Sequence, residues 1–173
     1  HPSDLLPETN IVPYQEFTNY LKSDVNIGAG ATATITSNNI QLSSIPDKVI
    51  VWVRPRQGNL TWSTPDVYAS IESVSVLFNN QSGLLSSASK VELFNMAQEA
   101  GLKETWQAYS GAASRFDTVS GLNELVPTSG CPLVLNFGEH ISINEDYFCA
   151  GSIGSFNFQI TVVCKNNLGA AYD

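Results

Sequence analysis

The strongest structural signal in the chain is the stretch Ile45-Pro46-Asp47-Lys48-Val49-Ile50-Val51-Trp52-Val53-Arg54-Pro55. Its first four residues predict a turn, because proline fixes φ and the charged pair keeps the turn solvated. Residues 49–53 are an unbroken apolar run, typical of a strand that is covered on both faces. Pro55 ends that strand, since proline cannot donate to a sheet ladder. In a chain this short, such cover requires a second layer plus a partner, or a loop folded back over the sheet.

The composition indicates one domain with a substantial core, because 43% of the 173 residues are apolar and 14% are charged. The net charge of −8 argues against a nucleic acid partner. No run of about 18 apolar residues occurs, so we expect no membrane span. The chain starts with His1, and we therefore expect a processed product or a fragment. We expect an extended arm or linker over residues 1–13, a folded domain over 14–166 and a tail over 167–173.

Short segments of strand character follow one another along most of the chain. The clearest is residues 156–164, where large apolar residues alternate with polar ones. Residues 69–78 alternate in the same way, and we expect the two inward faces to pack against each other in one core. The candidate core residues are Val74, Val76, Phe78, Phe156, Phe158, Ile160 and Val162. Further strands are expected over residues 14–21, 31–36, 40–42 and 133–137, with loops over 56–66 and 111–130.

One segment has a helical period instead. Leu93, Met96, Ala97 and Ala100 follow the spacing i, i+3, i+4, i+7, which predicts a helix over residues 89–100. Ser89 and Glu92 fit a capping box at its start, and Gly101 is suited to a left-handed stop. After it, Trp106 and Tyr109 are expected to lie over the edge of the sheet and protect it. The whole pattern predicts an all-β fold, an antiparallel jelly-roll β-sandwich with a short helical insertion.

The order of several motifs resembles one jelly roll of a double jelly-roll major capsid protein, of the Polinton-like virus, virophage and adintovirus type. These motifs are residues 45–54, 75–86, 93–96, Gly101-Leu102 with Trp106, 132–138 and 151–158. The last two are similar to the end of the C-terminal jelly roll in that family. The family carries two jelly rolls per chain and this sequence has room for one. An N-terminal jelly roll is therefore expected elsewhere in the same protein or as a separate chain.

The resemblance implies a structural protein of DNA viruses without catalytic residues, metal or cofactor. Its partners would be copies of itself in a homotrimer, and neighbouring capsid proteins. Such trimers form pseudo-hexameric capsomers of an icosahedral shell. The implied location is the virion capsid, with assembly in the host nucleus or cytoplasm.

The sequence also contains residues that could carry chemistry, and each has a structural interpretation that we favour. Glu139-His140 with Glu145-Asp146 could bind a cation, but a solvated acidic loop is the preferred interpretation. Cys131, Cys149 and Cys164 have no CxxC spacing, so free thiols are expected over a Cys131–Cys149 bridge. Cys149 is interpreted as a small buried hydrophobe and Cys164 as core. The expected inward positions are apolar, which argues against an enzyme.

The candidate subunit interface consists of apolar residues in loops, namely Leu60, Trp62, Leu84 and Leu85. Trp62 either packs onto the sandwich or serves an interface. Trp52 is expected to be packed instead of lining a sugar site. The alternative function is a carbohydrate- or receptor-binding jelly roll, such as a lectin-like module or a spike head. Glycosylation sequons at Asn59 and Asn80, the loop tryptophan and the acidic loop favour this alternative.

Overall fold

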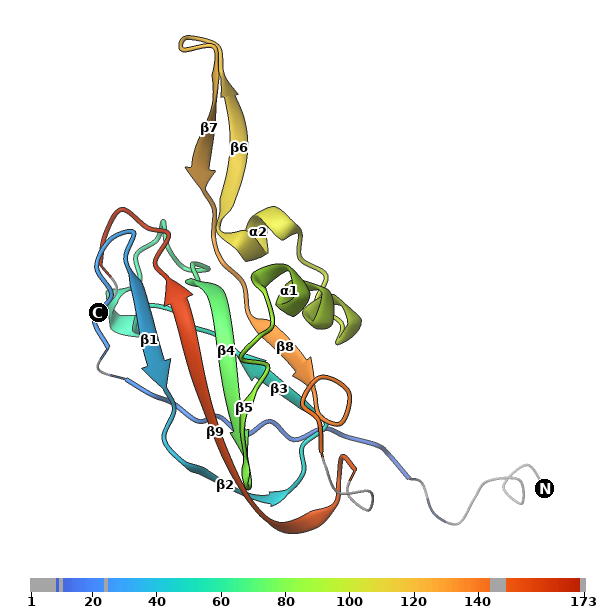
Figure 1. Cartoon of the computed structure of the whole chain (residues 1–173). Helices are drawn as coiled ribbons and strands as arrows, with labels where there is room; N and C mark the ends of the chain where they lie inside the picture. Colours follow the sequence, from blue (N-terminus) through green and yellow to red (C-terminus); the bar gives the residue numbers. More distant parts are fainter. Residues whose placement is uncertain (1–8, 10, 24, 144–148, 172–173) are drawn as a thin grey trace, which may run out of the picture.

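The computed structural model of the protein describes residues 9, 11–23, 25–143 and 149–171 (Figure 1). In this part of the chain the largest sheet is five-stranded, with the order β1-β9-β4-β5 and with β2 also paired to β9. Its strands are β1 (Thr32–Thr36), β2 (Ile40–Ser44), β4 (Ser70–Phe78), β5 (Gln81–Leu84) and β9 (Ile153–Lys165). All pairings in it are antiparallel.

Strand β9 organises this sheet because it is 13 residues long. Its C-terminal half pairs with β1, from Thr36↔Thr161 to Thr32↔Lys165, and its N-terminal half pairs with β2, as in Ile40↔Phe158. Along its other edge it pairs with β4. The alternation seen in the sequence places its large apolar side chains on one face of the sheet, and this face forms one side of the hydrophobic core.

The second layer is smaller. Strands β3 (Lys48–Val51) and β8 (Leu133–Asn136) form an antiparallel pair, and helix α1 (Lys90–Glu99) packs against β8 and β4. Helix α2 (Trp106–Ser110) lies beside α1 and β4. A 3-10 turn, η2 (Gln57–Asn59), lies in the connection from β3 to β4. Strands β6 (Ala112–Asp117) and β7 (Leu122–Pro127) form a separate hairpin that projects beyond α2 (Figure 1).

The candidate core residues all lie in the buried core, at exposures of 7% or less. Their arrangement differs from the expected one. β4 and β9 are neighbours in one sheet, with Val74↔Val162, Val76↔Ile160 and Phe78↔Phe158 side by side, so they do not face each other across the sandwich. The facing contact comes from Phe137, just after β8, whose ring centroid lies 5.5 Å from Phe78 and 5.8 Å from Phe158.

The predicted helix and its capping box are confirmed. The Glu92 amide donates to Ser89 Oγ at 3.3 Å, and the Ser89 amide donates to Glu92 Oε2 at 2.7 Å. Leu93, Phe94 and Ala97 form the buried side of the helix. Gly101 follows with φ of 111°, a conformation that glycine adopts without a Cβ penalty.

We expect Ser89→Ala to lower the free energy of unfolding by about 0.5–2 kcal/mol, because the Glu92 amide loses the Ser89 Oγ that accepts its hydrogen bond. Urea denaturation followed by circular dichroism measures the change. Ser87→Ala, at an exposed position two residues before the cap, is the control and should stay within about 0.5 kcal/mol. Equal losses in the two variants would show that the capping box does not stabilise the fold.

Two sequence predictions of element type are wrong. Residues 14–21 form no strand; they are exposed throughout, because without alternation they have no single face to bury. Residues 111–130 are not a loop but contain the β6–β7 hairpin. Its turn is fixed by Asp117, whose carboxylate accepts the amides of Val119 and Ser120, and by Gly121 at φ of 69°. Hydrogen bonds to the ionised form, from the Ser120 side chain first and then from these two amides, lower the pKa of Asp117.

The prediction that residues 49–53 are covered on both faces is also wrong for this chain. Val49, Val51 and Val53 pack against the core, whereas Ile50 is 41% and Trp52 40% exposed. The small second layer has one covered face, so the alternate side chains of an apolar run reach its outer surface. Of the two explanations that the sequence left open, a loop folded back does not cover these residues.

Candidate interaction surface

The four predicted interface residues do not form one surface. Trp62, in the connection between β3 and β4, is 94% exposed, while Leu60 nearby is half-buried. Leu84 is the last residue of β5, an edge strand of the main sheet, and Leu85 follows it; both pack against the core. Trp62 is therefore the member of this set with a fully available side chain, and the role of all four residues stays a prediction.

Apolar side chains are also exposed in groups in three other places, none of which includes the four predicted interface residues. Ile50 lies on the outer face of β3, and Trp52 follows directly after that strand; both are exposed. The extended segment of residues 11–23 carries a series of side chains that are 53–92% exposed, namely Ile11, Val12, Tyr14, Phe17, Tyr20 and Leu21. The hairpin carries Phe116, Val119, Leu122 and Leu125. The exposed residues at β3 could be found from the sequence, since an unbroken apolar run such as 49–53 is typical of a strand that is covered on both faces.

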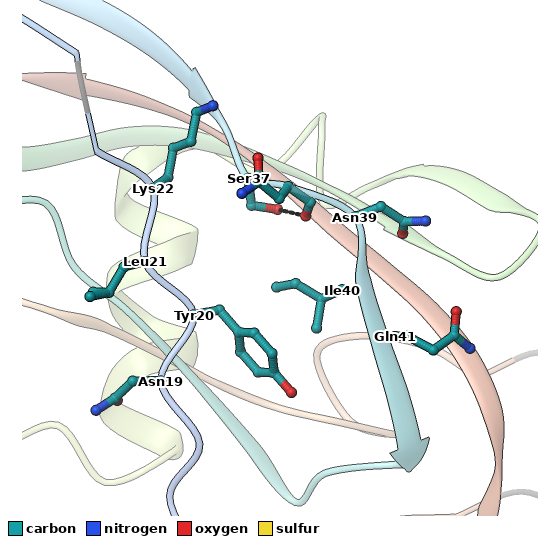
Figure 2. Close-up of a pocket in the computed structure, with 9 residues that line it drawn as sticks. Asn19, Tyr20, Leu21, Lys22, Ser37, Asn39, Ile40 and Gln41 are labelled. Atoms are coloured by element: carbon teal, nitrogen blue, oxygen red, sulfur yellow. Dashed lines mark hydrogen bonds between the residues drawn. The ribbon is translucent and has the colours of Figure 1, made fainter.

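A pocket of about 360 Å³ with a mixed polar and apolar lining lies between the extended segment and the turn from β1 to β2 (Figure 2). Residues 19–22 line one side and residues 37–41 the other, and Figure 2 shows amide side chains from both. Lys22 supplies its positive charge and Tyr20 its aromatic ring. The ring is 53% exposed, and Ser37 Oγ is already bonded to the Asn38 carbonyl at 2.9 Å. The pocket is open, and Ser37 in its lining is already hydrogen-bonded within the protein. The side chains that line it do not form a set of catalytic groups.

His140 has a structural role. Its Nδ1 accepts the Asn136 amide at 3.1 Å, and its Nε2 lies 3.2 Å from Glu99 Oε2. The side chain is 5% exposed, so the ring ties the end of α1 to the turn after β8. Glu145 and Asp146, the other members of the suggested cation site, lie outside the described residues. Within the described ranges no group of three or more His, Cys, Asp or Glu side chains could hold a metal ion.

A partly buried polar contact joins the two helices to the main sheet. Lys90 Nζ donates to Glu72 Oε1 at 2.7 Å and to the Ser110 carbonyl at 2.9 Å. Tyr109, beside it, is fully buried, and burial raises the pKa of its phenol well above the usual range. Trp106, 36% exposed, packs edge-on against Phe94 with centroids 5.4 Å apart. These groups fasten the helices over the sheet as expected for Tyr109, with Trp106 at the boundary to solvent.

The cysteines are free thiols, as expected. Cys131 and Cys164 are buried, and desolvation raises the pKa of both thiols, that of Cys131 to about 12. The interpretation of Cys149 as a buried hydrophobe is wrong, since the residue is exposed. It lies in a turn where its amide donates to Ser152 Oγ at 2.9 Å, and this local bonding replaces core packing.

We expect a thiol reagent at about pH 8 to label Cys149 alone in the folded protein, and all three cysteines after unfolding. Burial keeps the other two thiols protonated and out of contact with the reagent. Peptide mass spectrometry of the labelled protein identifies the sites. Labelling of Cys131 or Cys164 at a similar rate without denaturant would contradict the burial of those two strand-associated thiols.

No helix in the described part of the chain has the length and apolar content needed to cross a membrane.

Residues 15–172 match the family described as "Major capsid protein V20 C-terminal domain". The chain belongs to this family. It is 30% identical over 169 residues to the putative capsid protein V20 of Sputnik virophage, covering 93% of this chain. The chain spans 28% of the length of that relative.

Solved structures agree with this capsid-domain family. A chain in the 3.5 Å cryo-EM structure of the Sputnik virophage matches with a TM-score of 0.74 and 27% identity, over 91% of this chain and 34% of that one. The crystal structure of the mavirus major capsid protein matches with a TM-score of 0.66 over 82% of this chain and 30% of that one. At 13% identity, the second likeness shows the fold alone.

These matches confirm the resemblance to a virophage-type jelly roll and the predicted fold class. This domain is a structural module of a viral capsid protein, and its location is the virion capsid. Family membership favours this role over the lectin-like alternative. A family whose members build shells also gives a reason for exposed apolar side chains on an acidic, sparsely charged domain.

Proposed function

We propose that this capsid domain is one of two jelly rolls in a subunit that forms homotrimers, and that these trimers are the pseudo-hexameric capsomers of an icosahedral shell. The supporting observation is the partial exposure of Ile50, on the outer face of β3, and of Trp52, directly after it, in an apolar run that is typical of full cover. In the proposed assembly an adjacent jelly roll covers this face. Partners are then the N-terminal jelly roll of the same protein, copies of the subunit and neighbouring capsid proteins.

The energetics of the proposed contact follow from the side chains involved. Removing apolar area from water contributes roughly 25 cal/mol per Å², and aromatic anchors such as Trp52 concentrate that gain. Association also costs translational and rotational freedom, so the isolated domain should associate weakly and the two-domain subunit more strongly. We assign no catalytic residue and no cofactor to the domain. We propose residues 14–166 as the folded unit, with an arm before it and a tail after it. We also propose that assembly takes place in the host nucleus or cytoplasm.

Light scattering of the full-length protein, followed by electron microscopy, tests the proposal. Trimers or shells are the expected result. Trp52→Ser should weaken the assembly. Trp62→Ser, at a fully exposed loop position, is compared with it and tests the predicted interface that contains Trp62. A full-length protein that stays monomeric at high concentration would overturn the trimer. Binding of a glycan through the Trp62 loop in such a monomer would support the lectin-like function instead.

A further inference from the structure

The smaller layer of the domain ends at a free strand edge. Within the described residues β3 pairs with β8 and with no other strand. The Phe137 amide donates to the Asp47 carbonyl at 3.0 Å, and the register of the pair continues without a shift along β3. In an antiparallel pair alternate residues turn their N–H and C=O groups toward the partner strand, and the residues between them turn these groups away. The main-chain groups of Lys48 and Ile50 therefore point to an edge where a further strand can pair.

The chain at this edge carries positive charge on an acidic domain. Residues 48–56 include Lys48, Arg54 and Arg56 and no Asp or Glu, which gives +3, whereas the whole chain has −8. Lys48 Nζ donates to the Ala100 carbonyl at 2.6 Å, and the two arginines are exposed. The strands β1, β2, β5 and β8 contain no charged residue. Among the strand edges of the two layers described, the edge at β3 is thus the one that attracts an acidic segment.

The extended segment at the start of the chain has the complementary chemistry. The sequence of residues 1–21 contains three carboxylates and no Lys or Arg, which gives −3. Residues 11–18 pair with no strand of their own copy, and Tyr14 and Phe17 are 78% and 76% exposed. Residues 19–22 line the pocket at the turn from β1 to β2 (Figure 2), so the segment before them starts from the body of its own domain. Eight extended residues reach about 26 Å from that point.

We propose that residues 11–18 of one copy add as a strand to the free edge of β3 in a second copy. This inference rests on the proposed function, in which copies of the subunit meet. The edge requires an extended backbone with free N–H and C=O groups, and residues 11–18 have that conformation without a strand partner in the copy described. On the added strand, large apolar side chains lie beside Ile50 and Trp52, which are 41% and 40% exposed.

Charge directs this contact between copies that otherwise repel each other. Each copy carries −8, so only a local pairing of opposite charges favours the approach of two copies. The segment with −3 and the edge with +3 provide that pairing. The contact is heterologous, because the segment of one copy meets β3 of the next, and such contacts close into rings when the rotation between copies allows it. The added strand lies at the edge of the layer and leaves the outer face of β3 to the adjacent jelly roll.

Two exposed arginines provide a matched test. Arg54 lies at the edge, directly after the apolar run, and Arg115 lies on the β6–β7 hairpin with its side chain 66% exposed. Arg54→Glu and Arg115→Glu change residue type and net charge identically, so a long-range electrostatic effect on assembly is the same in both. In the full-length protein we expect Arg54→Glu to raise the concentration for half-assembly at least about tenfold, and Arg115→Glu to leave it within about twofold.

Glu16, in the segment, allows the charges to be exchanged. Glu16→Arg alone should weaken assembly, because it places a cation against the basic edge. The double variant Glu16→Arg/Arg54→Glu should assemble better than either single variant, since opposite charges meet again. The double variant Glu16→Arg/Arg115→Glu should stay as weak as Glu16→Arg, which separates a contact at β3 from a general effect of net charge.

Light scattering across a concentration series measures the assembly, and thermal unfolding shows that each variant is folded. A synthetic peptide of residues 2–21, added in excess to the wild type, should inhibit assembly, and a scrambled peptide of the same composition should not. Unchanged assembly of Arg54→Glu in a background that forms trimers would overturn the strand addition and leave the trimer standing. Weakened assembly of Arg54→Glu without inhibition by the peptide would mean that a different segment occupies the edge, which also overturns it. A wild-type protein that never assembles would overturn the proposed function itself, and this contact with it.

Discussion

Replacing Phe158 with alanine should lower the free energy of unfolding by about 3–5 kcal/mol, the largest loss we expect from a single side-chain truncation. Phe158 is 4% exposed and lies on β9 between Ile40 of β2 and Phe78 of β4. Its ring centroid is 5.8 Å from that of Phe137, which comes from the facing layer. The side chain therefore contacts both layers, and its removal leaves a cavity that the rigid sheet cannot close.

Urea denaturation monitored by tryptophan fluorescence measures this loss. Phe17→Ala is the control, because Phe17 is 76% exposed and should change stability by less than about 0.5 kcal/mol. A loss below about 1 kcal/mol for Phe158→Ala would mean that the inward register of β9 is wrong, since a one-residue slip moves every side chain to the other face.

Where the sequence pattern is local and regular, it predicts the fold well. The alternation of residues 156–164 identifies the inward face of β9, and Ser89 with Glu92 identifies the start of α1. Both signals involve residues a few positions apart, which the backbone geometry alone brings to one face or one turn. The sequence does not reveal which strands are neighbours and which face each other. That β4 lies beside β9 is a long-range choice, and either arrangement would bury Val74, Val76 and Phe78.

The surface was harder to predict than the core. The apolar run at 49–53 predicts cover on both faces, but this chain covers one face, and the pattern is the same whether further cover comes from this chain or from a partner. The hairpin was missed because turn residues such as Gly121 dominate residues 111–130, and its alternation mixes charges with isolated apolar residues. The sequence predicted Leu60, Trp62, Leu84 and Leu85 as interface residues because apolar residues in expected loops are easy to recognise. It did not predict Phe116 and Leu125, because the exposure of a side chain depends on the three-dimensional packing.

Gly130→Ala should destabilise the domain by about 3 kcal/mol or more. Gly130 is buried just before β8, and its amide donates to the Tyr68 carbonyl at 3.0 Å. A Cβ at this position would lie 2.5 Å from the Ala69 carbonyl oxygen and 2.8 Å from the Ser70 amide nitrogen. These are backbone atoms at the start of β4, and the Ala69 amide is itself bonded to the Val53 carbonyl at 2.8 Å. Overpacking usually costs about 1–3 kcal/mol, and here no side chain can rotate to relieve it.

Gly58→Ala is the matched control, because a Cβ added at Gly58 meets no atom within 4 Å and its φ lies outside the left-handed region. That substitution should be neutral or slightly stabilising, since alanine reduces the freedom of the unfolded chain. Thermal unfolding of the two variants side by side separates the steric effect at Gly130 from the general effect of replacing glycine. Similar stabilities would contradict the close approach of the β8 entry to β4. A large difference would show that the close backbone contact between Gly130 and Ala69 holds the entry to β8 against the start of β4.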